Sequence, residues 1–468
     1  MNELVPMSAR LKSLMLLTTV SLLPAGTALA QVPLAPPARP VVGAPAVAPA
    51  RLQPGTTAPA VAQPQSAQPV LPPPPPPLPP AVWDMQNAQD LLLYIQQVGR
   101  DGLNPADYDP DGLIIAMRSG DPIAMSKAAT DRFDQLSSDL ALGHVKKAAR
   151  VGWFMTDNDL DAAKQDTLLR GALLQHRLTD ALNGLLPTHP QYAALKAALA
   201  ATPASQKSKI ERIRLNMDRW RWMPRELGSK YIIVNVPGFH ATLVENGVNR
   251  WKQRAIAGKL STPTPQLSAT AVGVMLNPWW EVPKSIEKEA AGKKGFVPVK
   301  GADGKIQRWR QPPGPTNALG QLKFVMYNPY NIYLHDTNAR SRFNDQVRAL
   351  SHGCVRTQHI LDLATELLGD DGGEWTPEKI QATLDSKKTV QANFVKPLPV
   401  YIVYFSSAAL LDGSIVDYKD LYGRDAKAMM ALDMKDGGAS LAKPKASDEI
   451  ANPAAKPKSK AGSLVATR

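Results

Sequence analysis

Residues 351–356 of the chain read SHGCVR, and this motif holds Cys354, the only cysteine among 468 residues. A histidine, His335, closes the β-rich run 332–335 upstream of it. A lone cysteine is most often a small buried hydrophobe, but a neighbourhood of Ser, His, Gly and Arg is too polar for that role. The motif therefore predicts a reactive cysteine nucleophile in a strand-rich domain.

The residues around Cys354 are of the types that thiol catalysis needs. A cysteine attacks as the thiolate, so it needs a base, and we expect His335 rather than the nearer His352 to take the proton. We expect His352 to position the substrate, with a structural hydrogen-bonding role left open. The amide groups of Gly353 and Cys354 are candidates for holding an oxyanion, and Arg356 suits a substrate carboxylate.

The second half of the chain has the pattern of a mainly β domain. We expect a helix over residues 358–368, whose positive end would favour the thiolate of Cys354. The Lys/Gly/Pro-rich stretch 283–319 shows no periodicity, and a loop of that length is usually a functional lid or disordered. Runs rich in β-branched and aromatic residues predict strands over residues 231–236, 239–245, 254–256, 273–276, 323–327, 332–335 and 400–405.

The first half up to residue 215 predicts a helical region after two segments of other kinds. Residues 1–30 have basic residues, a short apolar run and a small-x-small site, the layout of a secretory signal peptide. Residues 31–82 are Pro/Ala-rich and predict a semi-rigid linker. We therefore expect export to the periplasm, with membrane attachment only if the signal stays uncleaved.

Residues 83–215 predict helices with no catalytic constellation, which indicates a scaffold. Asp121 followed by proline is a helix start signal. Further helices are expected over residues 157–182 and 192–199. After Asp121, apolar residues recur at three- and four-residue steps, as in an amphipathic helix: Met125, Ala129, Phe133, Leu136 and Leu140.

Composition limits the range of partners. Hydrophobic residues make up 44% of the chain, enough for packed cores, and the net charge is +13. A basic surface suits anionic partners such as acidic wall polymers, but no nucleic-acid-binding pattern accompanies it. Lys/Ala/Pro-rich residues 435–468 predict a disordered tail. We expect no nucleic acid, metal or cofactor, since the remaining histidines lack metal-ligand spacing: His144, His176, His189, His240 and His359.

The spacing of His335 and Cys354 resembles that of the L,D-transpeptidases, the YkuD-type enzymes of cell-wall synthesis. Fifteen residues, 336–350, separate His335 from Ser351-His352-Gly353-Cys354, as in the family motif. The likeness covers residues 86–425 and is greatest to the YcbB-like, scaffold-bearing subgroup. Other segments that resemble this subgroup are Arg356 and residues 219–222, 277–283, 311–315 and 327–336.

The resemblance implies an α+β multidomain fold. A helical scaffold domain, residues 83–215, would be followed by a mainly β YkuD-type catalytic domain, residues 216–430, with an inserted capping lid over about 286–318. The subgroup usually inserts a peptidoglycan-binding module, but residues 187–220 are too few to hold it. Affinity for the wall would then come from the scaffold, the lid or the basic charge.

The resemblance also assigns roles. It makes Cys354 the nucleophile and His335 the base, with the backbone carbonyl of Asp336 as the third member. It places Tyr333 near the donor site, and Ser351 belongs to the motif that meets the substrate. Trp280 is expected to line the cleft or support the lid, although a core aromatic is the open alternative.

The implied reaction is acyl transfer between peptidoglycan stem peptides. Cys354 would form a thioester at an L-to-D bond and pass the acyl group to an amine of a neighbouring stem, giving a 3-3 cross-link or a 1-3 link. Carbapenem acylation of Cys354 is a further implication. An L,D-carboxypeptidase using the same site and a non-catalytic wall-binding scaffold remain alternatives. Papain-like proteases do not fit, because they place the histidine after the cysteine.

Overall fold

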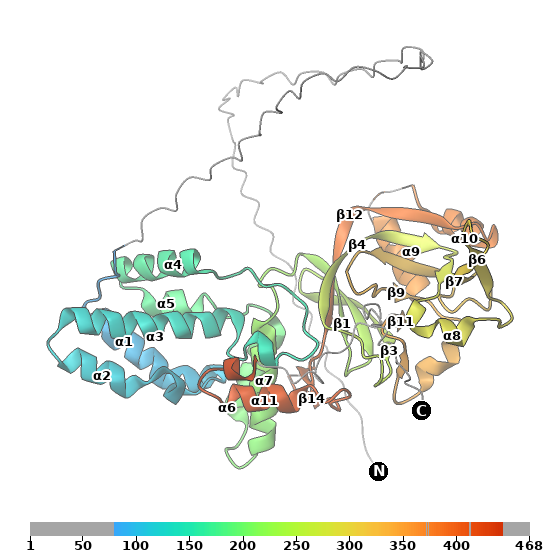
Figure 1. Cartoon of the computed structure of the whole chain (residues 1–468). Helices are drawn as coiled ribbons and strands as arrows, with labels where there is room; N and C mark the ends of the chain where they lie inside the picture. The colour runs from blue at the N-terminus through green and yellow to red at the C-terminus, as the bar shows by residue number, and fades with distance from the viewer. Residues whose placement is uncertain (1–78, 371, 373, 411–412, 443–468) are drawn as a thin grey trace, which may run out of the picture. The chain divides into compact units, whose positions relative to one another are not determined.

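The computed structural model describes residues 79–370, 372, 374–410 and 413–442. A helical region and a mainly β region follow one another along the chain and belong to one compact unit (Figure 1). The predicted signal peptide, nearly all of the predicted linker, and residues 443–468 of the predicted tail lie outside the described residues. No helix in the described part of the chain has both the length and the apolar character needed to span a membrane.

Seven α-helices form the helical region, as the sequence predicts. In α3 the side chain of Asp121 accepts hydrogen bonds from the amides of Ile123 and Ala124, and the predicted apolar stripe is buried. The helix predicted over 157–182 is two helices, because the chain turns at His176, whose φ of 49° is left-handed. The helices are α1 Met85–Gln97, α2 Pro110–Arg118, α3 Pro122–Leu142, α4 Ala162–Gln175, α5 Leu178–Asn183, α6 Pro190–Ala201 and α7 Lys207–Arg221.

Helix α7 runs across the predicted boundary between residues 215 and 216. Its buried residues belong to two cores at once, since Trp220 packs with Phe405 of the β region while Leu215 lies in a separate cluster with Trp222. The first strand begins only at Lys230. The change from helix to strand therefore lies at residues 222–229.

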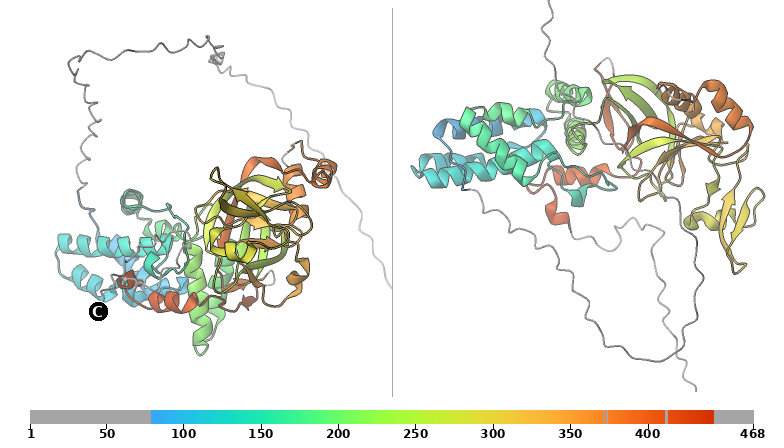
Figure 2. Two further views of the ribbon diagram at one scale, coloured as in Figure 1. Left: turned by 45° about the vertical axis from the view of Figure 1, so that its right-hand side comes forward. Right: turned by 90° about the horizontal axis from the view of Figure 1, so that it is seen from above.

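A nine-stranded sheet forms the β region, in the order β10-β3-β11-β9-β8-β4-β12-β1-β2. Strand β2 also pairs with β3, so the sheet closes on itself around an apolar core. Figure 2 shows this curved sheet from two further sides. Its strands are β1 Lys230–Asn235, β2 His240–Glu245, β3 Val248–Gly258, β4 Leu267–Leu276, β8 Leu322–Met326, β9 Leu334–His335, β10 Ala349–Ser351, β11 Val355–Thr357 and β12 Val390–Val403.

Two helices complete the core of the β region. Helix α9, Ile360–Asp370, buries Leu363 and Leu367, and α10, Pro377–Asp385, buries Ile380. The sequence predicts the first of these over 358–368, two residues too early at both ends. A short hairpin of β13, Ser407–Ala409, and β14, Ile415–Asp417, follows β12.

The stretch expected as an irregular lid has its own secondary structure. It consists of a three-stranded sheet, β5-β7-β6, with the short helix α8, Glu287–Ala290, on a small core of its own. The sequence conceals these strands because most of their residues are exposed and carry no apolar alternation. The strands are β5 Trp280–Glu281, β6 Val297–Lys300 and β7 Ile306–Gln311.

Part of the tail expected to be disordered is folded. Helix α11, Asp425–Leu432, packs with α7, and the amide of Lys146 donates to the carbonyl of Gly437. A short 3-10 helix, Ala439–Ala442, follows. Residues 435–442 thus return to the helical region, held by backbone hydrogen bonds that composition does not reveal.

Candidate active site

The two motif segments lie side by side in the sheet. Strand β9 pairs with β11 in parallel, with Leu334 opposite Val355 and His335 opposite Arg356. Leu334 and Val355 are fully buried in the core. Because side chains alternate along a strand, His335 and Arg356 project from the other face, where Cys354 also lies. The sheet therefore brings together the histidine and the arginine that the sequence predicts, and the charge of Arg356 acts on the Cys354 thiol.

The loop before Cys354 is held by its own hydrogen bonds. The Ser351 hydroxyl donates to the Cys354 carbonyl at 2.5 Å and accepts from the Gly353 amide at 3.1 Å. Thr264 donates to the Gly353 carbonyl at 2.7 Å. Gly353 has φ +122°, a backbone conformation that residues other than glycine rarely adopt. Ser351 is buried, so in this structure it shapes the loop, and its role in substrate binding stays a prediction.

These bonds leave one backbone donor for an oxyanion. The Gly353 amide is occupied by the Ser351 hydroxyl. The Cys354 amide has no hydrogen-bond partner in the part of the chain that the structure describes. Of the two predicted donors, Cys354 is therefore the one available to a substrate.

The resting site holds a thiol and a neutral imidazole. Burial raises the pKa of Cys354 to about 11, although Tyr333, Lys323 and Arg356 act in the opposite direction. Burial, together with the charge of Arg356, lowers the pKa of His335 to about 3. The helix expected to favour the thiolate, α9, is separated from Cys354 by β11, and burial outweighs the groups that lower the thiol pKa. His335 is therefore uncharged at neutral pH in the resting structure.

The backbone of Asp336, which the resemblance implies as the third member of the site, lies beside His335 but forms no hydrogen bond to its Nδ1 atom. The backbone of Asp336 lies close enough to raise the pKa of His335, against the effect of burial and Arg356. The Nδ1 atom of His335 nevertheless has no partner at hydrogen-bond geometry among the described residues. The Asp336 carboxylate is bound by Arg340 at 2.7 Å and by the Gln321 amide at 2.9 Å, which fixes the backbone beside the histidine.

Arg356 is placed to bind an anion. Its guanidinium is half-buried, and its Nε has no hydrogen-bond partner within the described residues. Burial lowers its pKa, while the nearby Cys354 raises it. A buried donor without a partner is costly, and a substrate carboxylate would satisfy it.

Lys323 also belongs to this cluster, and the sequence analysis missed it. It lies opposite His335 in the β8–β9 pairing, and its ammonium is 5.0 Å from the ring centroid of Tyr333. Burial lowers the pKa of Lys323, and the charge of Cys354 raises it. A lysine on a strand normally indicates a solvated face, so only the pairing with His335 distinguishes it.

Two predicted substrate contacts connect this cluster to the lid. The Trp280 side chain of β5 lies near enough to the Tyr333 hydroxyl to lower its pKa, although burial raises that pKa overall. His352 is exposed and lies 3.3 Å from Glu289 of α8 and 3.1 Å from Lys259. His352 therefore joins the lid to the motif loop, and its role toward the substrate stays a prediction.

Comparisons with known proteins agree with this arrangement. A family model described as "L,D-transpeptidase catalytic domain" matches residues 229–395, and a "Scaffold domain" model matches residues 80–199. The chain carries an L,D-transpeptidase catalytic domain. The predicted scaffold followed by a YkuD-type domain of the cysteine-dependent transpeptidases is confirmed at this level.

Individual relatives are more distant than the family match. A Haemophilus influenzae protein named "Putative L,D-transpeptidase" is 29% identical over an alignment of 336 positions, and the match covers 64% of this chain and 68% of that protein. An Enterococcus faecium L,D-transpeptidase structure is 12% identical, with a TM-score of 0.22, over 39% of this chain and 52% of that one. L,D-transpeptidase 1 of Mycobacterium tuberculosis is 15% identical, with a TM-score of 0.18, over 37% and 61%. The chain thus spans about half the length of the first of these structures.

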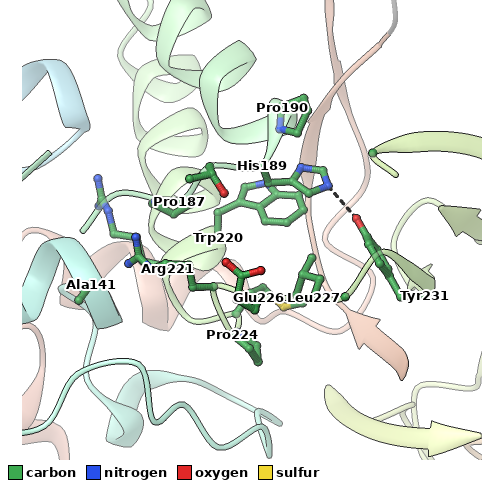
Figure 3. Close-up of a pocket in the computed structure, with 15 residues that line it drawn as sticks. Ala141, Pro187, His189, Pro190, Trp220, Arg221, Pro224, Glu226, Leu227 and Tyr231 are labelled. Carbon is green, nitrogen blue, oxygen red and sulfur yellow. Dashed lines mark hydrogen bonds between the residues drawn. The ribbon is translucent and has the colours of Figure 1, made fainter. Parts of the chain in front are cut away.

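A separate pocket lies between the helical and β regions of the chain (Figure 3). The aromatic rings of this wall stack on one another, since the ring centroids of His189 and Trp220 are 4.1 Å apart. Trp220 also stacks on Phe405, with centroids 4.5 Å apart. His189 also shares a hydrogen bond of 3.1 Å with the Tyr231 hydroxyl, and burial lowers its pKa to about 4. No residue of the 351–356 motif lines this pocket, so it is not the catalytic site.

Proposed function

We propose that the chain is a peptidoglycan L,D-transpeptidase that uses Cys354 as its nucleophile. The observation that supports the proposal is the β9–β11 pairing, in which His335 lies opposite Arg356, two residues after Cys354. The family match supports the reaction class. The substrate is a peptide stem of the cell wall, because Arg356 and Lys323 offer two cations to its carboxylates.

The first half-reaction makes a thioester. As Sγ of Cys354 attacks the carbonyl carbon of an L-residue, its proton passes to His335, and the Cys354 amide stabilises the oxyanion. The carbon–nitrogen bond to the D-residue then breaks, and the leaving amine takes the proton from His335. One amide bond is replaced by one thioester, and a D-amino acid or short peptide departs.

The second half-reaction transfers the acyl group. The amine of a neighbouring stem attacks the thioester carbon and gives a proton to His335, and the carbon–sulfur bond breaks to return the thiol. We favour the 3-3 cross-link, in which the attacked bond precedes a terminal D-residue, over the 1-3 link. Water in place of the amine would make the same site an L,D-carboxypeptidase.

The proposal also covers the localisation of the protein and its reaction with carbapenems. The N-terminal segment 1–30 supports export, and we propose the periplasm as the site of action. The thiol that attacks a stem amide also attacks a strained lactam, so we propose that carbapenems acylate Cys354. The alternative of a wall-binding scaffold without activity is disfavoured by the assembled cysteine and histidine.

Mass spectrometry of the protein incubated with disaccharide-tetrapeptide tests this function, with Cys354→Ala as the control. A cross-linked dimer that has lost one D-amino acid, absent from the control, is the expected product. Trimmed monomer alone would make the enzyme a carboxypeptidase, and a dimer with a larger loss would indicate the 1-3 link. Untouched substrate together with an unmodified Cys354 after carbapenem treatment would leave the scaffold alternative.

Arg356→Lys separates a forked contact from a simple positive charge. We expect kcat/KM to fall about tenfold or more, because lysine keeps the charge but loses the planar pair of donors. The matched control is Arg250→Lys, a surface arginine paired with Glu245 at 3.5 Å, which we expect to leave kcat/KM unchanged. Full activity of Arg356→Lys would exclude the carboxylate-clamp role.

A further inference from the structure

A short segment of the helical region reaches the catalytic half of the chain. The Phe154 amide donates to the Gln266 carbonyl at 2.8 Å, and the Gln266 amide donates to the Gly152 carbonyl at 2.8 Å. Trp153 is fixed on the other side by edge-on contact with Trp222, with centroids 5.3 Å apart. The segment is therefore anchored to Gln266, the residue before β4 begins. Phe154 keeps 44% of its surface exposed.

The ring of Phe154 lies against Tyr330, beside the catalytic cysteine. Their centroids are 4.4 Å apart and their planes differ by 35°, and Tyr330 is 38% exposed. The backbone carbonyl of the next residue, Asn331, accepts a hydrogen bond from the Cys354 thiol at 3.5 Å. Asn328 holds this loop, since its side chain accepts from the amides of Tyr330 at 3.2 Å and Ile332 at 3.1 Å.

We propose that Phe154 and Tyr330 form a sugar-binding platform for the glycan strand that carries the stem peptide. Two exposed aromatic rings that touch offer a broad apolar surface, which fits the C–H face of a pyranose. The surface is larger than a single scattered apolar residue, and its loop contacts the Cys354 thiol through the Asn331 carbonyl. This inference rests on the proposed function and names the part of the substrate that meets the scaffold.

The chemistry of the two neighbouring surfaces separates sugar from peptide. The cluster around Cys354 contains Lys323, His335 and Arg356, which suit a peptide with carboxylates. The Phe154–Tyr330 platform presents uncharged rings, which suit an uncharged sugar. Three residues of extended stem span at most about 10 Å, so the sugar must bind close to the cleft. Tyr330 of the platform directly precedes Asn331, whose carbonyl accepts a hydrogen bond from the Cys354 thiol.

The platform gives the scaffold a direct part in substrate binding. Phe154 comes from the helical region and Tyr330 from the catalytic region, so neither region contains the whole surface. The same segment is linked to the motif loop, because Thr264, two residues before Gln266, donates to the Gly353 carbonyl at 2.7 Å. This surface would thus supply part of the affinity for the wall.

The test compares two donors on the full chain: disaccharide-tetrapeptide and the free tetrapeptide. For Phe154→Ala and Tyr330→Ala, we expect the ratio of kcat/KM, disaccharide donor over free donor, to fall about five- to tenfold. Leu174→Ala is the control, since Leu174 is 84% exposed on α4, and we expect its ratio to match the unmodified protein. An unchanged ratio in both variants, whether activity is kept or lost equally on the two donors, would overturn the platform.

A binding measurement keeps this inference separate from the proposed function. Peptide-free glycan strands are titrated calorimetrically into Cys354→Ala, with and without Phe154→Ala. We expect binding that weakens about five- to tenfold when Phe154 is removed. This result in a protein that turns over neither donor would retain the platform and refute the transpeptidase. Glycan affinity that does not depend on Phe154 would refute the platform while leaving the transpeptidase intact.

Discussion

At the scale of single residues, the catalytic thiol is protonated at rest. Cys354 is held by its hydrogen bond to Asn331 and by burial, and its pKa is raised to about 11. The nearby cations Lys323 and Arg356 oppose this effect without overcoming it. Under the proposed mechanism, activation comes from proton transfer to His335 during attack rather than from a preformed ion pair.

Alkylation of Cys354 by iodoacetamide measures this state without interference from other thiols. Because the reactive thiolate is a small fraction below the pKa, we expect the rate to rise about tenfold per pH unit between pH 7 and 9. The measurement is the adduct mass against time at each pH, with Cys354→Ser as the unreactive control. A rate that levels off below pH 8 would show a thiolate already present at rest.

Lys323→Met removes the cation that the sequence analysis overlooked. We expect a further rise in the pKa of Cys354 and an alkylation rate at pH 8 lower by about tenfold, the change expected for one pKa unit. Lys379→Met is the matched control, because the Lys379 ammonium also lies over an aromatic ring, Trp375, at 4.4 Å. Equal rates for the two variants would remove Lys323 from the site.

At the scale of elements, the lid is tied to the sheet at its base. The buried side chain of Asn317 donates to the carbonyls of Pro278 and Pro312, each at 2.9 Å, on the segments that enter and leave the lid. Asn277, one residue before Pro278, donates to carbonyls at the end of α10. The lid is therefore a small independent structure with a fixed base, and its contacts with Tyr333 and His352 bring it onto the motif.

Asn317→Ala should loosen this base. We expect a loss of about 1–3 kcal/mol in the free energy of unfolding, because buried carbonyls lose their partner, and a higher KM for the stem peptide. Chemical denaturation and steady-state kinetics measure the two effects. Asn338→Ala serves as the control, since exposed Asn338 makes one bond of 3.0 Å to the Thr316 carbonyl. An unchanged KM in Asn317→Ala would mean that the base does not position the lid.

At the scale of the whole molecule, the C-terminal segment joins the two regions through buried charges. Arg219 of α7 pairs with Asp425 of α11 at 2.8 Å. His144 lies 2.7 Å from Asp139 and bonds to the Met434 carbonyl at 2.8 Å. Burial lowers the pKa of His144, but the hydrogen bond and charge of Asp139 raise it to about 9. The histidine is thus protonated at neutral pH and holds the returning segment.

The interaction of His144 with Asp139 predicts that the folded protein loses stability at alkaline pH. Because the folded pKa of His144 is raised, its contribution is fully present below about pH 6.5 and is lost as the pH rises through 9. We expect the melting temperature of the unmodified protein to fall more between pH 7 and 10 than that of His144→Gln. Parallel curves for the two proteins would show that His144 does not stabilise the fold through its charge.

The sequence by itself determined the order of the regions and the residues of the proposed reaction centre. Cys354, His335 and Gly353 were predictable because covalent chemistry and backbone conformation restrict which residue types serve there. The amphipathic stripe of α3 and most strands were predictable because burial imposes a period on the chain. The lid strands were not, because exposed strands leave no such period in the sequence.

Only the tertiary structure decided which distant side chains meet. Lys323 joins the site through its register with His335, and Phe154 reaches Tyr330 through hydrogen bonds to Gln266. It also decided the protonation of the thiol, since burial outweighs the neighbouring cations. Pairing register and burial depend on contacts between residues far apart in the chain, and local composition carries no record of them.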